Sequence, residues 1–483
     1  MFMHFKGKHF IILTFLYFLI ISCKQNDLVN PILKTSISSS LSTKWIGFGY
    51  NQDPLDRDQR GHDVGNWDEA RWNLTKDRIS QIRPSFVRIV LYRHWFNPSG
   101  IVGQYEWESP AMRSLYKVLA FYQDKNIPVM TGLWQSTLDF QDNVPFYTSV
   151  GEASFQKLQV DMFRQLFVSK GFQNLTLYTP TNEPKGMGMD FQKWSLMMRN
   201  TYQAFADAKL PLSIFTGADS WDEWTLSAAI YNKNELSAYD HHYYLNFGIN
   251  QVIYGQLEEQ FRSEVANIHR YDNSIKPVFL SEVGFASTDK IDYWYVSNPI
   301  PSLNPTTTEY GLLALDYGIQ VARSGESGAL AWSLDGYDFG KDPGMWNIAG
   351  NNGGTFLRPW YYSWSLLCRY FPAGGKVYPI NFSSKMVRGV ALEKEGSDKS
   401  HWTFAFVNWE NKEVETFFSI PNFKGGDFIK FQMTESSSGD GFALSLPKEN
   451  AKINSLQNGF SITIPARGGV LITSMENSPI AKQ

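Results

Sequence analysis

Two glutamates that each follow an apolar, strand-like run are the residues of this sequence with the clearest chemical potential. The run 175–181 leads into Asn182 and Glu183, which a proline follows, and the run 277–282 ends in Glu282. Two carboxyl groups held about 5–5.5 Å apart can cleave a glycosidic bond with retention, since one protonates the leaving oxygen and the other attacks the anomeric carbon. The sequence therefore predicts a catalytic pair, provided that the fold brings these two strand ends together.

The elements that must position this pair alternate between short apolar runs and amphipathic stretches from Trp45 onward, which predicts βα units and a parallel sheet. The expected strands are 45–50, 86–92, 128–133, 175–181, 212–218, 238–244, 277–282 and 328–333. The expected helices are 67–82, 110–125, 152–170, 190–208, 254–271, 308–324 and 359–370, with the segment after Trp221 less clear. This α/β pattern fits a (β/α)8 TIM barrel, in which working residues lie at the carboxyl ends of the strands. A doubly wound open sheet is the alternative, but no Gly-rich nucleotide loop follows the first strand.

In such a barrel Glu183 closes the fourth strand and Glu282 the seventh, and these strands face each other across the barrel mouth. After about residue 376 the pattern changes to short alternating runs, such as 402–407 and 468–472, separated by Gly, Asn, Asp and Ser. We therefore expect a catalytic barrel over 44–375 and a C-terminal antiparallel β-sandwich over 376–483.

The N-terminus has the pattern of a bacterial lipoprotein leader. Lys6 and Lys8 precede an apolar run, and a lipobox-like Ile-Ile-Ser leads to Cys23. This predicts a signal peptide over 1–22, a lipid on Cys23 and a tether over 23–43, so that the protein is held on a bacterial membrane facing the periplasm or the exterior. An uncleaved membrane helix is the alternative, for which the apolar run is short. The only other cysteine is Cys368, so with Cys23 lipidated no disulfide within the chain and no cysteine-based metal site is expected.

Charge and composition narrow the class of partner. The formal net charge is −3 with no long run of one sign, which argues against binding nucleic acid through a broad basic surface. Aromatic residues make up 16% of the chain, and their flat faces suit the C–H faces of sugar rings. A carbohydrate partner is therefore favoured over a nucleic acid.

With these motifs the sequence resembles the clan A retaining glycoside hydrolases, a superfamily of barrel enzymes with a glutamate on strand four and another on strand seven. The resemblance implies that Glu183 is the general acid/base and Glu282 the nucleophile, with no cofactor and no metal. Its further matches are Arg88 on strand two, an H-x-Y pattern at His242 and Tyr244 on strand six, and Trp332 at the end of strand eight. The resemblance also implies a cis peptide bond between Trp332 and Ser333.

Each match has a physical reason. Arg88 would keep Glu282 charged, and Tyr244 would donate a hydrogen bond to the same carboxylate. Asn182 would bond the sugar 2-hydroxyl, a contact that strengthens in the transition state, and Trp332 would form the floor of the subsite for the cleaved sugar. Glu183 must begin protonated.

Further candidates for substrate contact lie in neighbouring loops: Asn51, Trp134, Trp221 and Trp346, where the tryptophans are either subsite platforms or loop packing. Many members of the clan have a histidine at the end of strand three, whereas this strand ends in Gly-Leu-Trp at 132–134. In the clan this histidine recognises outer hydroxyls of the cleaved sugar, and we expect the loops 50–53 and 335–338 to replace it in that task. His241 and His242 are adjacent in a strand and face opposite ways, so they should not ligate one metal together.

The sequence thus predicts a lipid-anchored retaining glycosidase acting on a glycan. A surface lipoprotein that binds glycans without cleaving them is one alternative, and the presence of both glutamates argues against it. A transglycosylase with the same residues is another. The sugar, the linkage, endo or exo action and the oligomeric state do not follow from the sequence.

Overall fold

The computed structural model describes residues 33–34, 36–41, 43–56, 67–134, 153–186, 188–217, 222–245, 248–285, 306–335, 344–346, 357–419, 426–434, 449–453 and 459–475. The expected signal peptide, Cys23 and Trp221 lie outside these residues. Of the loop 335–338, only Asp335 is described. Within the described residues, no helix is long and apolar enough to cross a membrane.

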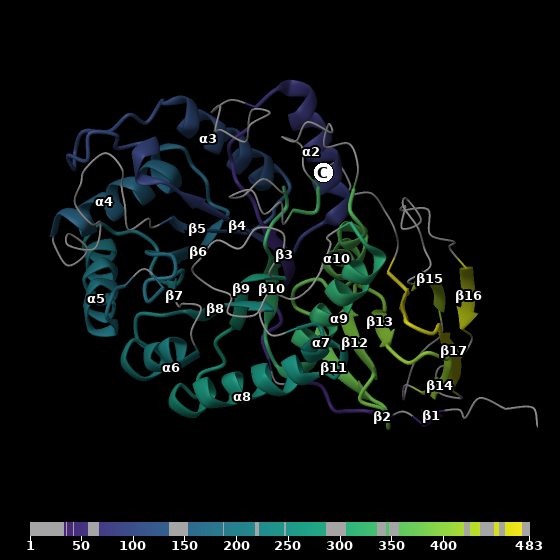
Figure 1. The fold of residues 1–483 in the computed structure, drawn as a ribbon. Coiled ribbons are helices and arrows are strands. Elements are labelled where there is room, and N and C mark those ends of the chain that lie inside the picture. Colours follow the sequence, from purple (N-terminus) through teal and green to yellow (C-terminus); the bar gives the residue numbers. More distant parts are fainter. Residues whose placement is uncertain are drawn as a thin grey trace, which may run out of the picture.

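Eight parallel strands form the centre of the larger part of the molecule (Figure 1). Their spatial order is β6-β5-β4-β3-β10-β9-β8-β7, and a parallel bridge between Tyr178 and Phe215 joins the two ends of this sheet. The strands are β3 (Gly47–Asn51), β4 (Phe86–Leu91), β5 (Val129–Leu133), β6 (Leu175–Thr179), β7 (Thr216–Gly217), β8 (Ala238–Leu245), β9 (Val278–Phe285) and β10 (Gly328–Ala331). The expected (β/α)8 barrel is confirmed, with a strand at each expected place.

Helices surround this barrel (Figure 1). They are α2 (Glu69–Ile82), α3 (Pro110–Asp124), α4 (Ala153–Arg164), α5 (Phe191–Asp207), α6 (Asp222–Tyr231), α7 (Asn250–Ile253), α8 (Gln256–Tyr271), α9 (Thr308–Ser324) and α10 (Pro359–Tyr370). Side chains cap several of them where the sequence changes from loop to helix: Asp68, Ser109, Asp190 and Thr307 each accept a backbone N–H of the first turn. The expected helix 152–170 is α4 followed by a π-helical turn, η3 (Gln165–Ser169).

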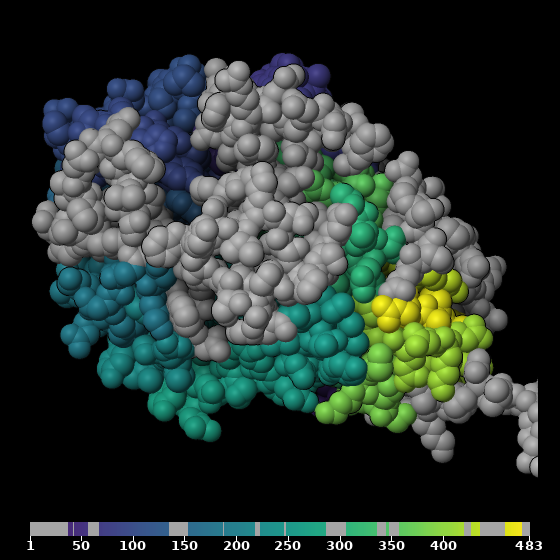
Figure 2. All heavy atoms as spheres, viewed as in Figure 1, coloured from purple at the N-terminus to yellow at the C-terminus, as the bar shows by residue number. Residues whose placement is uncertain are grey.

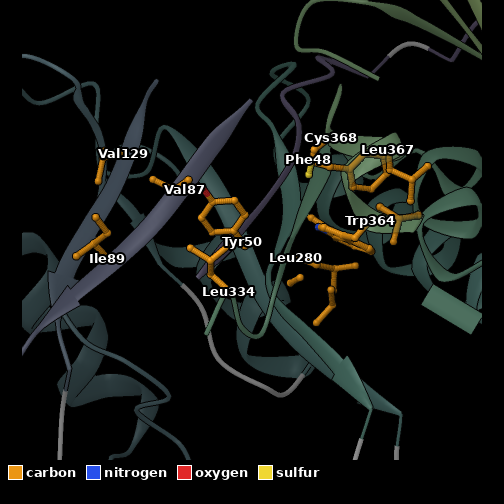
Figure 3. Packing of buried hydrophobic residues seen from close by; sticks show 14 of the residues in the cluster. Phe48, Tyr50, Val87, Ile89, Val129, Leu280, Leu334, Trp364, Leu367 and Cys368 are labelled. Carbon is orange, nitrogen blue, oxygen red and sulfur yellow. The ribbon is translucent and has the colours of Figure 1, made fainter. Parts of the chain in front are cut away.

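Alternation along the strands divides the core into two parts. Phe48 of β3 points outward and packs edge-on against Trp364 of α10, with Leu367 and Cys368 beside it (Figure 3). A separate buried cluster draws its residues from five strands and from no helix, and it fills the inside of the barrel: Phe86, Met130, Ala238, Phe279 and Leu330. Apolar side chains thus fill the inside of the barrel, and polar side chains lie at the carboxyl ends of the strands.

The C-terminal part is a pair of β-sheets facing each other. A seven-stranded antiparallel sheet has the order β16 (Glu449–Ile453), β15 (Gly426–Thr434), β18 (Gly468–Thr473), β13 (Ser400–Asn408), β12 (Val387–Glu395), β11 (Lys376–Asn381) and β2 (Ser36–Ile37). The second sheet has the order β1 (Leu33–Lys34), β14 (Val414–Phe418) and β17 (Phe460–Ile464). Phe404 and Phe418 meet between the sheets with ring centroids 5.0 Å apart. The expected β-sandwich is confirmed.

Two short strands come from the segment 23–43, for which a tether is expected. β2 pairs with β11, and β1 pairs with β14. Since both pairings join this segment to the sandwich sheets, its end is part of the folded molecule and only the part before β1 is left for a tether.

The sandwich lies against the barrel at α9, and Figure 2 shows the surfaces of the two parts in contact. Asp316 of this helix forms a fully buried ion pair with Arg388 of β12 and accepts a hydrogen bond of 2.6 Å from the indole of Trp409. Arg323 donates to the carbonyl oxygens of Ile380 and Gly389, each at 2.6 Å. These contacts join the two parts through charged groups that have been removed from water.

Candidate active site

Glu282 reaches the barrel mouth because β9 carries a bulge. Adjacent side chains of a regular strand face opposite ways, and Ser281 already points inward, where its hydroxyl donates to Asp240 at 2.6 Å. The register between β8 and β9 shifts between His241 and His242. A bulge re-aims the side chains that follow it, so Glu282 also turns inward, where it is only 2% exposed.

Arg88 of β4 holds the Glu282 carboxylate in a buried ion pair. The same guanidinium donates to the side-chain oxygen of Asn182 at 2.5 Å and to that of Asn51 at 3.1 Å. The amide nitrogen of Asn51 in turn donates to the carbonyl oxygen of Ser281 at 2.9 Å. Both ends of the Asn51 amide are therefore engaged by the protein, so Asn51, expected to bind substrate, is placed to position Arg88.

Glu183 lies in the loop that follows β6 and has a backbone φ of 42°, a left-handed conformation that costs a non-glycine residue about 1–2 kcal/mol. The loop is anchored from two helices. Gln159 of α4 donates to the carbonyl oxygen of Pro180 at 3.1 Å, and the indole of Trp194 in α5 donates to the Thr181 hydroxyl at 3.2 Å. Packing against two helices offsets the strain and directs the Glu183 carboxylate into the barrel mouth.

His242 of β8 lies between the two glutamates. Its Nδ1 is 2.8 Å from Glu183 Oε1 and 3.5 Å from Glu282 Oε2. One carboxylate oxygen of each glutamate and a ring nitrogen of His242 all lie within 4.8 Å of one another. Burial alone would lower the pKa of His242, but the negative charges of Glu282 and Glu183 outweigh it and raise this pKa above its ordinary value.

Tyr244 donates a hydrogen bond of 2.7 Å from its hydroxyl to Glu282 Oε2. Gly284 makes room for this ring, because a Cβ at position 284 would lie 2.9 Å from the Tyr244 ring. Gly284, two residues after Glu282, thus leaves space for the Tyr244 ring, whose hydroxyl bonds the Glu282 carboxylate. Each Glu282 oxygen therefore has a partner of its own, since Arg88 binds the other.

A small cavity lies beside Arg88 and is walled by aromatic rings. Trp332 and Trp134 stack there, with ring centroids 5.6 Å apart and planes inclined by 26°, and Tyr92 lies against Trp134 at 6.0 Å. The cavity measures about 60 Å³. The peptide bond between Trp332 and Ser333 is cis, as expected.

The structure brings most of the expected site residues into one network, and Trp346 is the exception. Its side chain is fully buried, its ring centroid is 5.8 Å from that of Tyr361, and the guanidinium of Arg78 lies 4.9 Å from the centre of its ring. Trp346 does not line the cavity. The ring packs in the core behind this cavity, which agrees with loop packing, the other role considered for it, and a role as a substrate platform stays a prediction.

Two further polar groups lie close to the site, of which Asp240 escaped prediction from the sequence. Asp240 accepts hydrogen bonds from the hydroxyls of Thr216 and Ser281 and so ties β7, β8 and β9 together under Glu282. Strand alternation carries a signal for it, since Asp240 is two residues before His242 and must share its face. Gln52 follows β3 in the loop 50–53, which was expected to replace the strand-three histidine, and it lines the cavity with its buried amide.

Two groups of His and Glu side chains in the described residues have spacings compatible with a metal ion: Glu183, His242 and Glu282, and Glu264, His241 and Glu326. In the first group the cation of Arg88 already pairs with Glu282, and His242 bonds Glu183 directly. Direct contacts of this kind suit proton transfer and charge stabilisation by the side chains themselves. The second group lies outside the network of Glu282.

No protein-family model matches the sequence, and no curated protein does. Solved structures do share the fold. A GH30 endoxylanase from Clostridium papyrosolvens is 12% identical with a TM-score of 0.60, and the match covers 92% of this chain and 99% of that one. A GH30 xylanase C catalytic domain from Talaromyces cellulolyticus is 12% identical with a TM-score of 0.63, covering 92% and 100%. An α-L-arabinofuranosidase from Thermotoga maritima is 11% identical with a TM-score of 0.60, covering 92% and 98%.

The match with each of these glycosidases extends over both the barrel and the sandwich, because it covers nearly the whole of each chain. The chain therefore has the fold of the clan A TIM-barrel glycosidases that its motifs resemble. At these identities the likeness establishes the fold alone.

Proposed function

We propose that this protein is a retaining glycoside hydrolase that cleaves O-glycosidic bonds of a glycan by double displacement. The observation that carries the proposal is the separation of the two glutamates, whose nearest carboxylate oxygens lie within 4.8 Å of each other. Retaining enzymes hold their carboxyl groups about 5–5.5 Å apart, whereas inverting enzymes need about 6.5–9.5 Å to admit a water. Their positions in the loop after β6 and in the second half of β9, in a fold shared with known glycosidases, support the same conclusion.

In the first step Glu282 attacks the anomeric carbon while Glu183 gives its proton to the leaving oxygen, and the glycosidic bond breaks. Arg88 and Tyr244 each bind one oxygen of Glu282 and hold the carboxylate turned for this attack. Asn182 is 1% exposed, and its amide nitrogen has no partner in the described part of the chain, so it is available to the sugar 2-hydroxyl. In the second step Glu183 takes a proton from a water that attacks the glycosyl-enzyme, which releases the sugar and restores both carboxyl groups.

The direct test is a screen of the chain from residue 24 against aryl glycosides and polysaccharides, followed by NMR of the first product formed. We expect the product to keep the anomeric configuration of the substrate, and Glu282→Gln to abolish turnover while the protein stays folded. A first product of inverted configuration would reject the mechanism. Full activity of Glu282→Gln would reject the assignment of the nucleophile.

The rival functions predict different products. A transglycosylase would give mainly lengthened glycans when an acceptor sugar is present, because water is kept from the glycosyl-enzyme. A glycan-binding protein without activity would bind a polysaccharide and leave it intact over long incubation. Mass spectrometry of the products distinguishes both from hydrolysis.

We also propose that Cys23 carries a lipid that anchors the protein to a bacterial membrane. The support is the sequence alone: the basic start, the apolar run and the lipobox-like residues before Cys23. Mass measurement of the native protein should find an acylated N-terminal Cys23, and Cys23→Ala should move the protein to the soluble fraction. An unmodified Cys23 in membrane-bound protein would contradict the proposal.

A further inference from the structure

Gln52 presents an amide group to the cavity beside the catalytic network. Its backbone N–H donates to the carbonyl oxygen of Arg88 at 2.9 Å, which fixes the residue just past the end of β3. Its side-chain oxygen accepts a hydrogen bond from the hydroxyl of Tyr122. Gln52 is 4% exposed and lines the cavity together with Arg88, Trp134 and Trp332.

A chain of hydroxyls fixes the orientation of this amide. The Tyr50 and Tyr122 hydroxyls are 3.0 Å apart, and both rings are fully buried. Burial raises the pKa of both hydroxyls, so both stay protonated and are able to donate. Tyr50 donates to Tyr122, and Tyr122 donates to the oxygen of Gln52. The Gln52 nitrogen must then point the other way.

The Gln52 nitrogen has no hydrogen-bond partner among the residues that the structure describes, although it is buried. Buried donors are almost always bonded, and leaving one unpaired costs about 1–3 kcal/mol. An amide that is oriented by two buried tyrosines, borders a cavity and lacks a partner is set up to bond an atom that arrives with a ligand.

We propose that Gln52 determines substrate specificity by donating a hydrogen bond from Nε2 to a hydroxyl oxygen of the sugar whose glycosidic bond is cleaved. This inference rests on the proposed glycosidase function. It places Gln52 on the side of the nucleophile, since its neighbour Asn51 bonds Arg88 and Arg88 bonds Glu282.

The charges around the cavity narrow the sugar to a neutral one. Among the described residues that line it, Arg88 is the only cation, and it is paired with Glu282. Within this part of the lining a sugar carboxylate would therefore find no cation that is not already paired. The stacked faces of Trp134 and Trp332 suit the C–H surface of a neutral ring.

The experiment compares wild type, Gln52→Ala and Gln52→Glu on the best aryl glycoside of the screen and on its monodeoxy analogues. We expect Gln52→Ala to lower kcat/KM by about 10- to 100-fold, as for a lost hydrogen bond that leaves a polar group unpaired. One deoxy analogue should lower kcat/KM by a similar factor in wild type and have no further effect in Gln52→Ala. Gln52→Glu, which replaces the NH₂ donor by an acceptor, should lose at least as much as Gln52→Ala.

Tyr122→Phe is the matched control for orientation. It keeps the ring and removes the hydroxyl that turns the amide, so it should weaken discrimination against the same deoxy analogue without a change of the Gln52 side chain. If every deoxy analogue has the same effect in wild type and Gln52→Ala, or if Gln52→Ala only lowers the melting temperature, the contact is refuted. Equal or better turnover of the matching uronide by wild type would refute the neutral sugar.

Calorimetry in the Glu282→Gln background separates this inference from the proposed function. Binding of the same sugar and its deoxy analogues reports the Gln52 contact whether or not a bond is cleaved. Loss of discrimination on Gln52→Ala in this background supports the contact even if hydrolysis is never observed. Unchanged affinities refute it even if the wild type is an active retaining enzyme.

Discussion

At the scale of single residues, the main feature of the site is an imidazole that lies between two carboxylates. His242 lies within 3.5 Å of a carboxylate oxygen of each glutamate and is 3% exposed. With its raised pKa, His242 is the group of the site that can hold a proton between the two carboxylates. The first prediction concerns this proton.

NMR titration of His242 should give a pKa above the ordinary value of about 6.5, and Glu282→Gln should lower it, because this removes the largest of the charges that raise it. A histidine whose pKa is raised by folding stabilises the native state fully below its unfolded pKa, and this stability is lost as pH rises through the folded pKa. His242→Gln should remove that loss from the pH profile of stability. A pKa that is unchanged in Glu282→Gln would contradict the electrostatic origin of the shift.

The sequence pointed to Glu183, Glu282 and Arg88 by side-chain type and by their place in strand-like runs, and the structure brings these three side chains into one network. It could not place Trp346, because the burial of a loop tryptophan depends on elements that arrive from elsewhere in the chain. It pointed to the loop 50–53 but could not single out Gln52, because the orientation of that amide depends on Tyr122 of another element. The bulge that turns Glu282 inward could not be predicted either, because it depends on how β9 pairs with β8.

At the scale of elements, the close approach of α9 and α10 is set by Gly318. A Cβ added at this position would lie 2.3 Å from a methyl carbon of Leu367. The expected bounds of both helices, 308–324 and 359–370, agree with the structure, since caps and periodicity are local signals. The tightness of their contact is not a local signal, and only the fold reveals it.

Gly318→Ala should therefore destabilise the protein, by about 1–3 kcal/mol, although alanine is the better helix former. Chemical denaturation measures this change in the free energy of unfolding. Leu367→Ala removes the methyl group that the new Cβ would meet, so Gly318→Ala should cost markedly less in that background. Equal costs in the two backgrounds would show that the steric contact is not the cause.

At the scale of the whole molecule, buried charges join the barrel and the sandwich. The ion pair of Asp316 and Arg388 is fully enclosed, and Trp409 adds a hydrogen bond to the same carboxylate. The barrel and the sandwich could be told apart in the sequence, because strands that alternate with helices give a different pattern from short strands with alternating apolar residues. The contacts between the two parts could not be predicted, since they join residues far apart in the chain.

Arg388→Ala should lower the free energy of unfolding by about 3–5 kcal/mol, because it leaves the Asp316 carboxylate buried without its cation. The double variant Arg388→Ala, Asp316→Ala should recover part of that loss. Calorimetry should show one shared unfolding transition in the wild type, since the sandwich shields α9. Two well-separated transitions in the wild type would contradict such coupling.

The measurement that tests the central claim most directly is azide rescue of Glu183→Ala and Glu282→Ala with a dinitrophenyl glycoside. With this leaving group the first step hardly needs a proton, so Glu183→Ala should form the glycosyl-enzyme and then stall without its base. Azide should restore turnover and give a glycosyl azide of retained configuration. Glu282→Ala should be rescued only weakly and with inverted configuration, because azide must replace the nucleophile itself. An inverted glycosyl azide from Glu183→Ala would contradict the roles assigned to the two glutamates.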